Sequence, residues 1–162
     1  MVRPLWKIPG VAHIAGRPRI YGTWKATLRP SSDSHIPPGG NRGPILGAMV
    51  IEQTFWTTAV RFHTDQSSSR SSTSAIATDI DSRQSKSFFF TYSNWAKQEH
   101  NARSYPHHGT TLLQIIGGEP KSLQGTYWTD RLTAGDVNLE LVDRSTSRTQ
   151  TDALSAVQYV DK

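Results

Sequence analysis

The sequence predicts an all-β protein, a small closed antiparallel barrel of about eight strands. Two observations predict it. Short segments with strand-like alternation recur along the chain, and turn residues separate them at short intervals. The chain has 162 residues, which suits one domain, and it contains no cysteine, which excludes disulfides and cysteine-bound zinc.

The first expected strand runs over residues 20–28 and is stopped by Arg29-Pro30. A loop rich in proline and glycine follows over residues 31–44, and we expect it to be mobile and to cover an opening. Two adjacent strands are then expected over residues 46–54 and 56–64. The second of these alternates, with Val60 on one face and Arg61 on the other.

The fourth expected strand, residues 67–77, is rich in serine and threonine (SSSRSSTSAIA). Composition alone would suggest a linker. However, the segment holds no glycine or proline and runs directly into Ile76 and Ala77. We interpret it as a polar strand that lines a wet cavity, because hydroxyl groups both donate and accept hydrogen bonds.

Four more strands complete the expected barrel. They cover residues 86–93, 109–116, 122–129 and 136–142, and a long loop is expected over residues 94–106. The remaining tail is polar, and we expect it to be weakly helical near Ala153 or disordered. The expected organisation is a basic leader at 1–17, the barrel domain at 18–143 and a polar tail at 144–162.

The net charge of +5 favours anionic partners such as nucleotides, nucleic acid or anionic lipid. The first 30 residues carry basic residues and no acidic one, which fits either a solvated leader or a stretch beside a membrane or phosphate surface. No apolar run approaches the roughly 20 residues of a membrane helix, and the start shows no signal-peptide pattern.

The motifs do not build a convincing active site. His107 and His108 are adjacent, so on a strand they would face opposite sides and make poor joint metal ligands. His108-Gly109-Thr110 matches one His-x-Thr element of the two-histidine phosphoesterases, but a second element is missing. The acidic residues are scattered, without a carboxylate pair. We therefore expect a non-enzymatic binding module without a metal or cofactor.

Aromatic and arginine side chains recur in the expected strands. A tryptophan there either packs in the core or offers a stacking surface for a base, worth about 1–3 kcal/mol. Arginines and hydroxyls would then hold phosphates. Gly22-x-Trp24 together with the late Arg131 also resembles the lipocalin pattern, in which a first-strand tryptophan packs against a late arginine at the closed end of a barrel.

Six segments taken in order carry a more specific resemblance. They are IYGTW (20–24), IEQTFW (51–56), SSSRSSTSA (67–75), FFFTYSN (88–94), HHGTTLL (107–113) and LQGTYWTDRLTAGDVNLEL (123–141). In this order the chain resembles, over about residues 18–143, the β-barrel sensor domain of the SMODS-associated, two-transmembrane, β-strand-rich effectors, also called Cap15.

The resemblance implies a receptor in a bacterial anti-phage (CBASS) system for a cyclic dinucleotide made by a partner nucleotidyltransferase (CD-NTase). In that family, ligand binding drives oligomerisation, and two N-terminal membrane helices then disrupt the inner membrane from its cytoplasmic face. The present sequence lacks those helices, so we expect either a soluble fragment that starts after them or a homologue with another output. The basic leader would suit a cytoplasmic juxtamembrane segment.

The resemblance and the residue pattern together suggest ligand contacts. Tyr92, Tyr127 and Trp24 are expected to stack on bases or form pocket walls. Four residues are expected to supply hydroxyls: Ser69, Ser71, Thr110 and Thr129. His108 and Arg131 are expected toward phosphate, and Arg61 is a further expected ligand contact. These expectations depend on strand register, because a shift of one residue turns every side chain of a strand to the opposite face. Two alternatives stay open, a lipocalin-like carrier of an apolar ligand and a single-stranded nucleic-acid-binding barrel.

Overall fold

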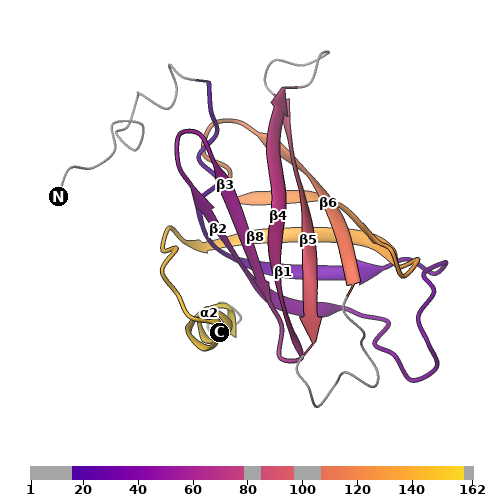
Figure 1. Ribbon diagram of the computed structural model, residues 1–162. Coiled ribbons are helices and arrows are strands. Elements are labelled where there is room, and N and C mark those ends of the chain that lie inside the picture. Colours follow the sequence, from indigo (N-terminus) through magenta and orange to yellow (C-terminus); the bar gives the residue numbers. More distant parts are fainter. Residues whose placement is uncertain (1–15, 79–84, 97–106, 159–162) are drawn as a thin grey trace.

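The computed structural model describes residues 16–78, 85–96 and 107–158, which form a closed barrel with one helix outside it (Figure 1). Eight antiparallel strands follow one another around the barrel in chain order, and β8 pairs with β1 to close it. The expected all-β closed barrel is confirmed. The strands are β1 (Gly22–Pro30), β2 (Ile45–Gln53), β3 (Thr58–His63), β4 (Ser67–Thr78), β5 (Ser85–Ala96), β6 (His107–Ile116), β7 (Ser122–Thr129) and β8 (Ala134–Asp143).

The expected strands agree with these bounds except at a few ends. The third strand begins at Thr58 rather than at Trp56, because Thr54 and Thr57 close a turn: the Thr54 amide donates to the Thr57 carbonyl (2.8 Å), and the Thr57 amide donates to the Thr54 hydroxyl (2.9 Å). The fifth strand continues to Ala96, so the expected loop starts later. Residues 97–106 and residues 1–15 of the leader lie outside the described residues.

One half of the barrel is filled with apolar side chains. Trp24, Phe88 and Leu113 are fully buried there, together with neighbours from all parts of the wall. The Trp24 indole donates a hydrogen bond to the Ile20 carbonyl (3.0 Å). This part is called the closed half below. It contains the chain's entry into β1 and its exit from β8.

The arginine that packs on Trp24 is Arg144, and the expectation that Arg131 does so is wrong. The Arg144 guanidinium lies 6.0 Å from the Trp24 ring centroid and donates to the carbonyls of Arg19 (2.9 Å) and Tyr21 (2.8 Å). Arg131 lies in the turn between β7 and β8, at the opposite end of those strands. The lipocalin-like pairing therefore exists, but with a residue just after the last strand.

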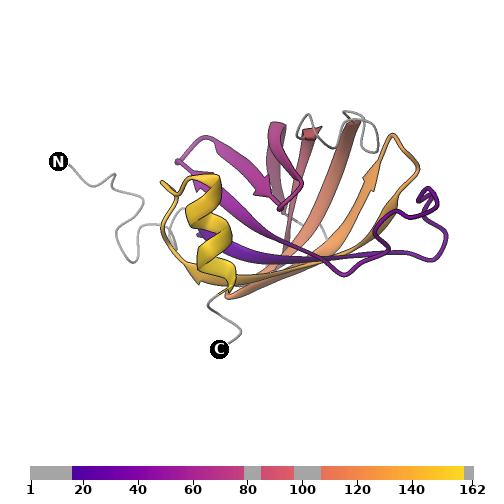
Figure 2. The same ribbon diagram turned by 90° about the horizontal axis from the view of Figure 1, so that it is seen from below.

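The tail forms a helix, α2 (Gln150–Gln158), that packs on the outer face of β2 (Figure 2). Ala153 and Val157 are buried against Ala48 and Val50. The Thr149 hydroxyl accepts a hydrogen bond from the Asp152 amide (3.3 Å), which caps the helix start. Within the described part of the chain, none of the helical structure has the length and apolar content of a transmembrane segment.

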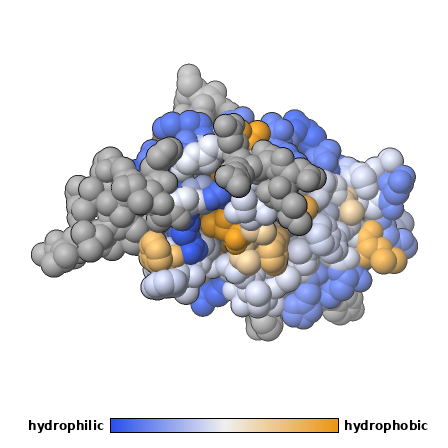
Figure 3. Space-filling view, turned by 90° about the horizontal axis from the view of Figure 1, so that it is seen from above, coloured by the Kyte–Doolittle hydropathy of each residue, from blue (hydrophilic) through white to orange (hydrophobic). Residues whose placement is uncertain are grey.

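The shortest strand pairing in the barrel is the one between β3 and β4. Their ladder contains only three pairs, from Arg61↔Arg70 to His63↔Ser68. Beyond it, serine side chains bridge the strands: the Val60 amide donates to the Ser71 hydroxyl (2.9 Å), and the Ser74 hydroxyl donates to the Thr58 carbonyl. The closed end seen from above carries apolar surface at its centre among more hydrophilic residues (Figure 3).

Candidate functional site

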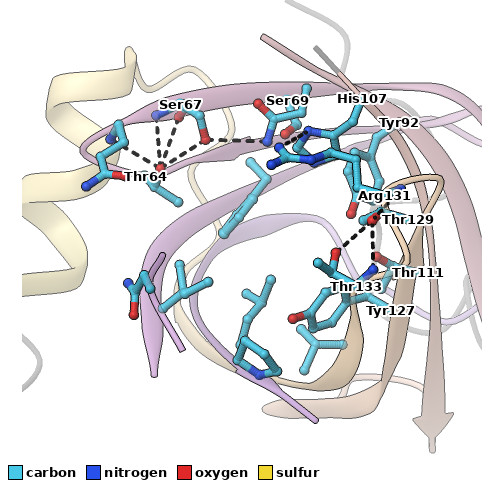
Figure 4. A pocket seen from close by; sticks show the side chains of 18 of the residues that line it. Thr64, Ser67, Ser69, Tyr92, His107, Thr111, Tyr127, Thr129, Arg131 and Thr133 are labelled. Carbon is cyan, nitrogen blue, oxygen red and sulfur yellow. Dashed lines mark hydrogen bonds between the residues drawn. The ribbon is translucent and has the colours of Figure 1, made fainter. Parts of the chain in front are cut away.

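The other half of the barrel is hollow. It encloses a cavity of about 1240 Å³, somewhat larger than the roughly 300–1,000 Å³ typical of ligand pockets. The mouth lies at the end opposite Trp24 and is bordered by the β1–β2 loop, the β3–β4 turn and the β7–β8 turn. Figure 4 shows side chains that line the cavity. This part is called the open half below.

The β1–β2 loop lies at this mouth, as expected from its sequence; its expected mobility stays a prediction. Residues 36–41 line the cavity. The loop is tied to the β7–β8 turn by main-chain hydrogen bonds, from the Ser31 amide to the Ala134 carbonyl (2.8 Å) and from the His35 amide to the Leu132 carbonyl (3.0 Å). Two of the three segments that border the mouth are therefore connected to each other.

The cavity wall consists of rows of side chains that run across neighbouring strands. The row nearest the mouth is Phe62, Ser69, Asn94 and His107, each paired with the next across the strand interface. The next row inward is Ser71, Tyr92, Gly109 and Thr129. The innermost row contains Phe90, Thr111 and Tyr127, beyond which the apolar core begins. These strands therefore bring polar side chains to the cavity, whereas the β1–β2 side of the mouth is lined by apolar residues such as Ile36, Pro38 and Ile45.

Two aromatic rings in this wall lie over glycines of the neighbouring strand. A Cβ atom added to Gly109 would lie 2.4 Å from the Tyr92 ring, and one added to Gly47 would lie 2.6 Å from the Phe62 ring. The rings can lie flat against the wall because the glycines leave that space free. The rings of Tyr92 and Phe62 therefore lie along the cavity wall and do not extend across the cavity.

Both tyrosines of the wall keep their phenolic protons over the physiological pH range. Burial is the main cause that raises the pKa of Tyr92, with smaller contributions from Tyr127 and Asp130. Burial also raises the pKa of Tyr127, helped by Asp136. Each phenol therefore offers a hydrogen-bond donor to the cavity at neutral pH.

Arg131 is a cationic residue at the rim of the cavity. Its guanidinium lies 3.3 Å from the His107 ring nitrogen (Figure 4). Its turn is held by the Thr129 hydroxyl, which pairs with the Thr133 hydroxyl (2.6 Å) and accepts from the Arg131 amide (3.3 Å). Leu132 completes the turn with φ of 58°. Arg131 is therefore held on a defined turn at the rim.

Six of the ten residues expected at the site line the cavity: Ser69, Ser71, Tyr92, Tyr127, Thr129 and Arg131. Two of the expected hydroxyls already have partners within the wall. The Ser71 hydroxyl bridges to β3, and the Thr129 hydroxyl holds its turn.

The structure does not bring the other four to the cavity. Trp24 is fully buried in the closed half. His108 and Thr110 point outward because β6 turns His107, Gly109 and Thr111 inward; the His108 ring bonds to the Ser93 hydroxyl on the outer face (3.0 Å).

Arg61 also lies outside the cavity, because Val60 and Phe62 occupy the inward positions of β3. Its guanidinium donates to the Glu52 carboxylate (2.7 Å) and to the carbonyls of Thr146 (2.9 Å) and Arg148 (3.2 Å). It therefore fastens the segment that leads to α2.

Sequence reasoning missed several polar or aromatic residues of the wall. Phe62, Asn94, His107 and Thr111 are among them. For Phe62 there was a signal, because alternation along β3 places Val60 and Phe62 on one face of the strand and Arg61 on the other. For Asn94 the sequence carried no signal, because its segment was expected to be loop.

The charges around the cavity are few. Arg131 is a cation of the wall and Asp65 is an acid at the mouth. Within the described residues there is no group of three histidine, aspartate or glutamate side chains placed to hold a metal ion. The arrangement provides aromatic faces, hydroxyls, an amide and a guanidinium, which suits a ligand with planar rings and an anionic group.

The family described as "Cap15, cyclic dinucleotide receptor domain" matches residues 16–141 of this sequence. The chain belongs to this Cap15 family. It is also 31% identical over 121 residues to a CD-NTase-associated protein 15 of Staphylococcus schleiferi, an alignment that covers 75% of this chain. The chain spans 59% of the length of that relative.

Proposed function

We propose that this barrel is a non-enzymatic receptor that binds a cyclic dinucleotide in its open half. The observation that carries the proposal is the cavity of about 1240 Å³, lined by Tyr92, Tyr127, hydroxyls and Arg131, in a chain of the Cap15 family. A cyclic dinucleotide has two planar bases and two phosphates. Aromatic walls can stack on the former, and a guanidinium can pair with the latter.

The mixed lining of the cavity supports this assignment. Its aromatic and apolar side chains suit the faces of the bases, while its hydroxyls and guanidinium suit the sugar and phosphate groups, which retain part of their hydration. Net positive charge on the chain favours the approach of an anionic ligand.

Isothermal titration calorimetry with a panel of cyclic dinucleotides tests the proposal. Binding of at least one member with one ligand per barrel is the expected result. Failure of every member to bind at high micromolar concentration would overturn it.

We further propose that ligand binding promotes self-association, and that the longer family protein acts on the inner membrane from its cytoplasmic face, with a CD-NTase as the source of its ligand. The support is family membership and the name of the staphylococcal relative. Sedimentation of the barrel with and without the bound nucleotide tests the first part. An unchanged sedimentation coefficient on saturation would contradict self-association by this part of the chain.

A second candidate function, a carrier of an apolar ligand, is favoured by Leu28, Met49 and Val60 on the cavity wall. Such binding would depend little on salt, whereas phosphate recognition weakens as salt rises. Titrations in rising salt separate the two functions, and a single-stranded oligonucleotide series tests the nucleic-acid-binding alternative through length-dependent affinity.

A further inference from the structure

Two buried polar atoms at the mouth of the cavity lack a hydrogen-bond partner among the described residues. They are the hydroxyl oxygen of Ser69 and the side-chain carbonyl oxygen Oδ1 of Asn94. Ser69 is only 4% exposed. Buried polar atoms in proteins are nearly always satisfied, because an unmet one destabilises the fold. Two of them on one cavity wall point to a ligand.

The two residues act as a pair because of the strand register. Ser69 on β4 and Asn94 on β5 are direct cross-strand partners, so their side chains stand next to each other on the inner face. Phe62 follows on one side of the row and His107 on the other. The pair therefore lies between the Phe62 ring on one side and His107, next to Arg131, on the other.

The Asn94 amide contacts the wall through its nitrogen. Nδ2 donates to the Ser67 hydroxyl (3.4 Å), and the Ser67 hydroxyl pairs with that of Thr64 (3.1 Å). In this orientation the oxygen Oδ1 is an acceptor without a partner among the described residues. The Ser69 hydroxyl beside it can donate or accept.

The amide oxygen calls for a donor on the ligand, N–H or O–H, and the hydroxyl beside it takes either a donor or an acceptor. Phosphate does not fit, because it offers no donor and its charge is repelled by a carbonyl oxygen. The Watson–Crick edges of nucleobases do fit, because each places an N–H beside a nitrogen or oxygen acceptor. Such a contact discriminates strongly, since a ligand without the donor would leave the amide oxygen unpaired.

We infer that Ser69 and Asn94 read the hydrogen-bonding edge of one base, which lies along the β4–β5 wall next to Phe62, with a phosphate directed toward Arg131 and His107. This inference rests on the proposed function and deepens it, because it gives base recognition to a pair of residues and separates it from phosphate recognition. It makes Asn94 and Ser69 specificity-determining residues.

The test compares Asn94→Leu and Ser69→Ala with two matched controls on outward-facing strand positions, Asn138→Leu and Ser93→Ala. The ligand is the tightest binder among cyclic diadenylate, cyclic diguanylate and cyclic diuridylate, measured by calorimetry. Each pocket variant should bind about 10- to 100-fold more weakly than the unmodified protein, as expected for loss of a buried hydrogen bond. The controls should bind like the unmodified protein.

A second readout separates recognition from structure. The Ser69 hydroxyl has no partner within the described part of the chain, so Ser69→Ala, measured without nucleotide, should leave the Tm unchanged or raise it. Weaker binding with an unchanged Tm supports the inference. Weaker binding with a lower Tm would mean a structural role and overturn it.

The remaining outcomes distinguish the two proposals. If no member of the panel binds the unmodified protein, both the receptor function and the base reading fail. If a member binds and the affinities of Asn94→Leu and Ser69→Ala are unchanged, the base reading alone fails and the receptor function stands.

Discussion

The two halves of this barrel share the same eight strands but use them in opposite ways. In the closed half the inward positions hold large apolar side chains such as Trp24 and Phe88, which are fully buried. In the open half the inward positions of the same strands surround a cavity, with polar and aromatic residues on β4 to β7 and apolar residues such as Met49 and Val60 on other strands. We therefore expect substitutions in the closed half to reduce mainly the stability of the fold, and substitutions in the open half to reduce mainly ligand binding.

The largest expected effect is on stability, from Trp24→Ala in the closed half. Trp24 is fully buried, and removal of its ring should lower the free energy of unfolding by about 3–5 kcal/mol. Urea unfolding measures the change. Tyr92→Ala in the open half is the comparison, and it should cost clearly less because its ring faces an existing cavity. Equal losses at both positions would contradict the division into halves.

The two arginines at opposite ends give a second contrast. Arg144→Met should destabilise the protein by about 2 kcal/mol, because it leaves the buried carbonyls of Arg19 and Tyr21 without their charged donor. Arg131→Met should weaken cyclic dinucleotide binding by at least about tenfold with a smaller change in unfolding free energy. Urea unfolding and calorimetry on both variants check the pattern, and the reverse pattern would contradict it.

A third prediction concerns the Tyr92 ring and the glycine beneath it. In Gly109→Ala the added methyl group would lie 2.4 Å from the ring, so the ring must move into the cavity. We expect the affinity for cyclic dinucleotide to fall on the order of tenfold, with a stability loss of about 1–3 kcal/mol from overpacking. Gly118→Ala is the control, because nothing lies within 4 Å of an added Cβ atom there. Unchanged affinity for Gly109→Ala would show that the position of Tyr92 does not matter for binding.

The smallest expected effect is a pH dependence from His63, near the mouth. Burial lowers the pKa of His63, with added repulsion from Arg61 and Arg70. The unfolded chain therefore binds a proton more readily than the folded one, so stability should fall as the pH drops below about 6.5, the ordinary histidine value. His63→Gln should reduce this loss, as measured by unfolding at pH 5 and pH 7.5. An identical pH dependence in the variant would exclude His63 as its source.

The same comparison explains how far the sequence could predict the molecule. The positions of strands with a buried apolar face could be predicted from the sequence. In β8, for example, apolar and polar residues alternate, and Val137 and Leu139 point inward. The barrel closure and the polar β4 strand followed from turn chemistry and composition. The family resemblance was correct for the same reason, since it rests on ordered segments of these strands.

The inward face of β6 could not be predicted from alternation. Both faces of HHGTTLLQII offer a histidine, a threonine and a leucine, so neither pattern identifies the core side. The choice is made by the register with β5 and β7, which turns His107 and Thr111 inward and His108 and Thr110 outward. A bulge between Ser71 and Thr73 similarly shifts the register of β4. These are long-range properties of the closed sheet.

The even number of antiparallel strands has a consequence for how this domain can be joined to other parts. A meander of eight strands returns the chain to the end at which it started, and Thr23 and Asp143 are indeed register partners. The entry to β1 and the exit from β8 are thus neighbours, and the mouth lies at the far end. Any fusion partner or label attached ahead of β1 therefore starts from the end of the barrel that is remote from the cavity. The ligand enters at the other end, so the attached group does not lie at the mouth.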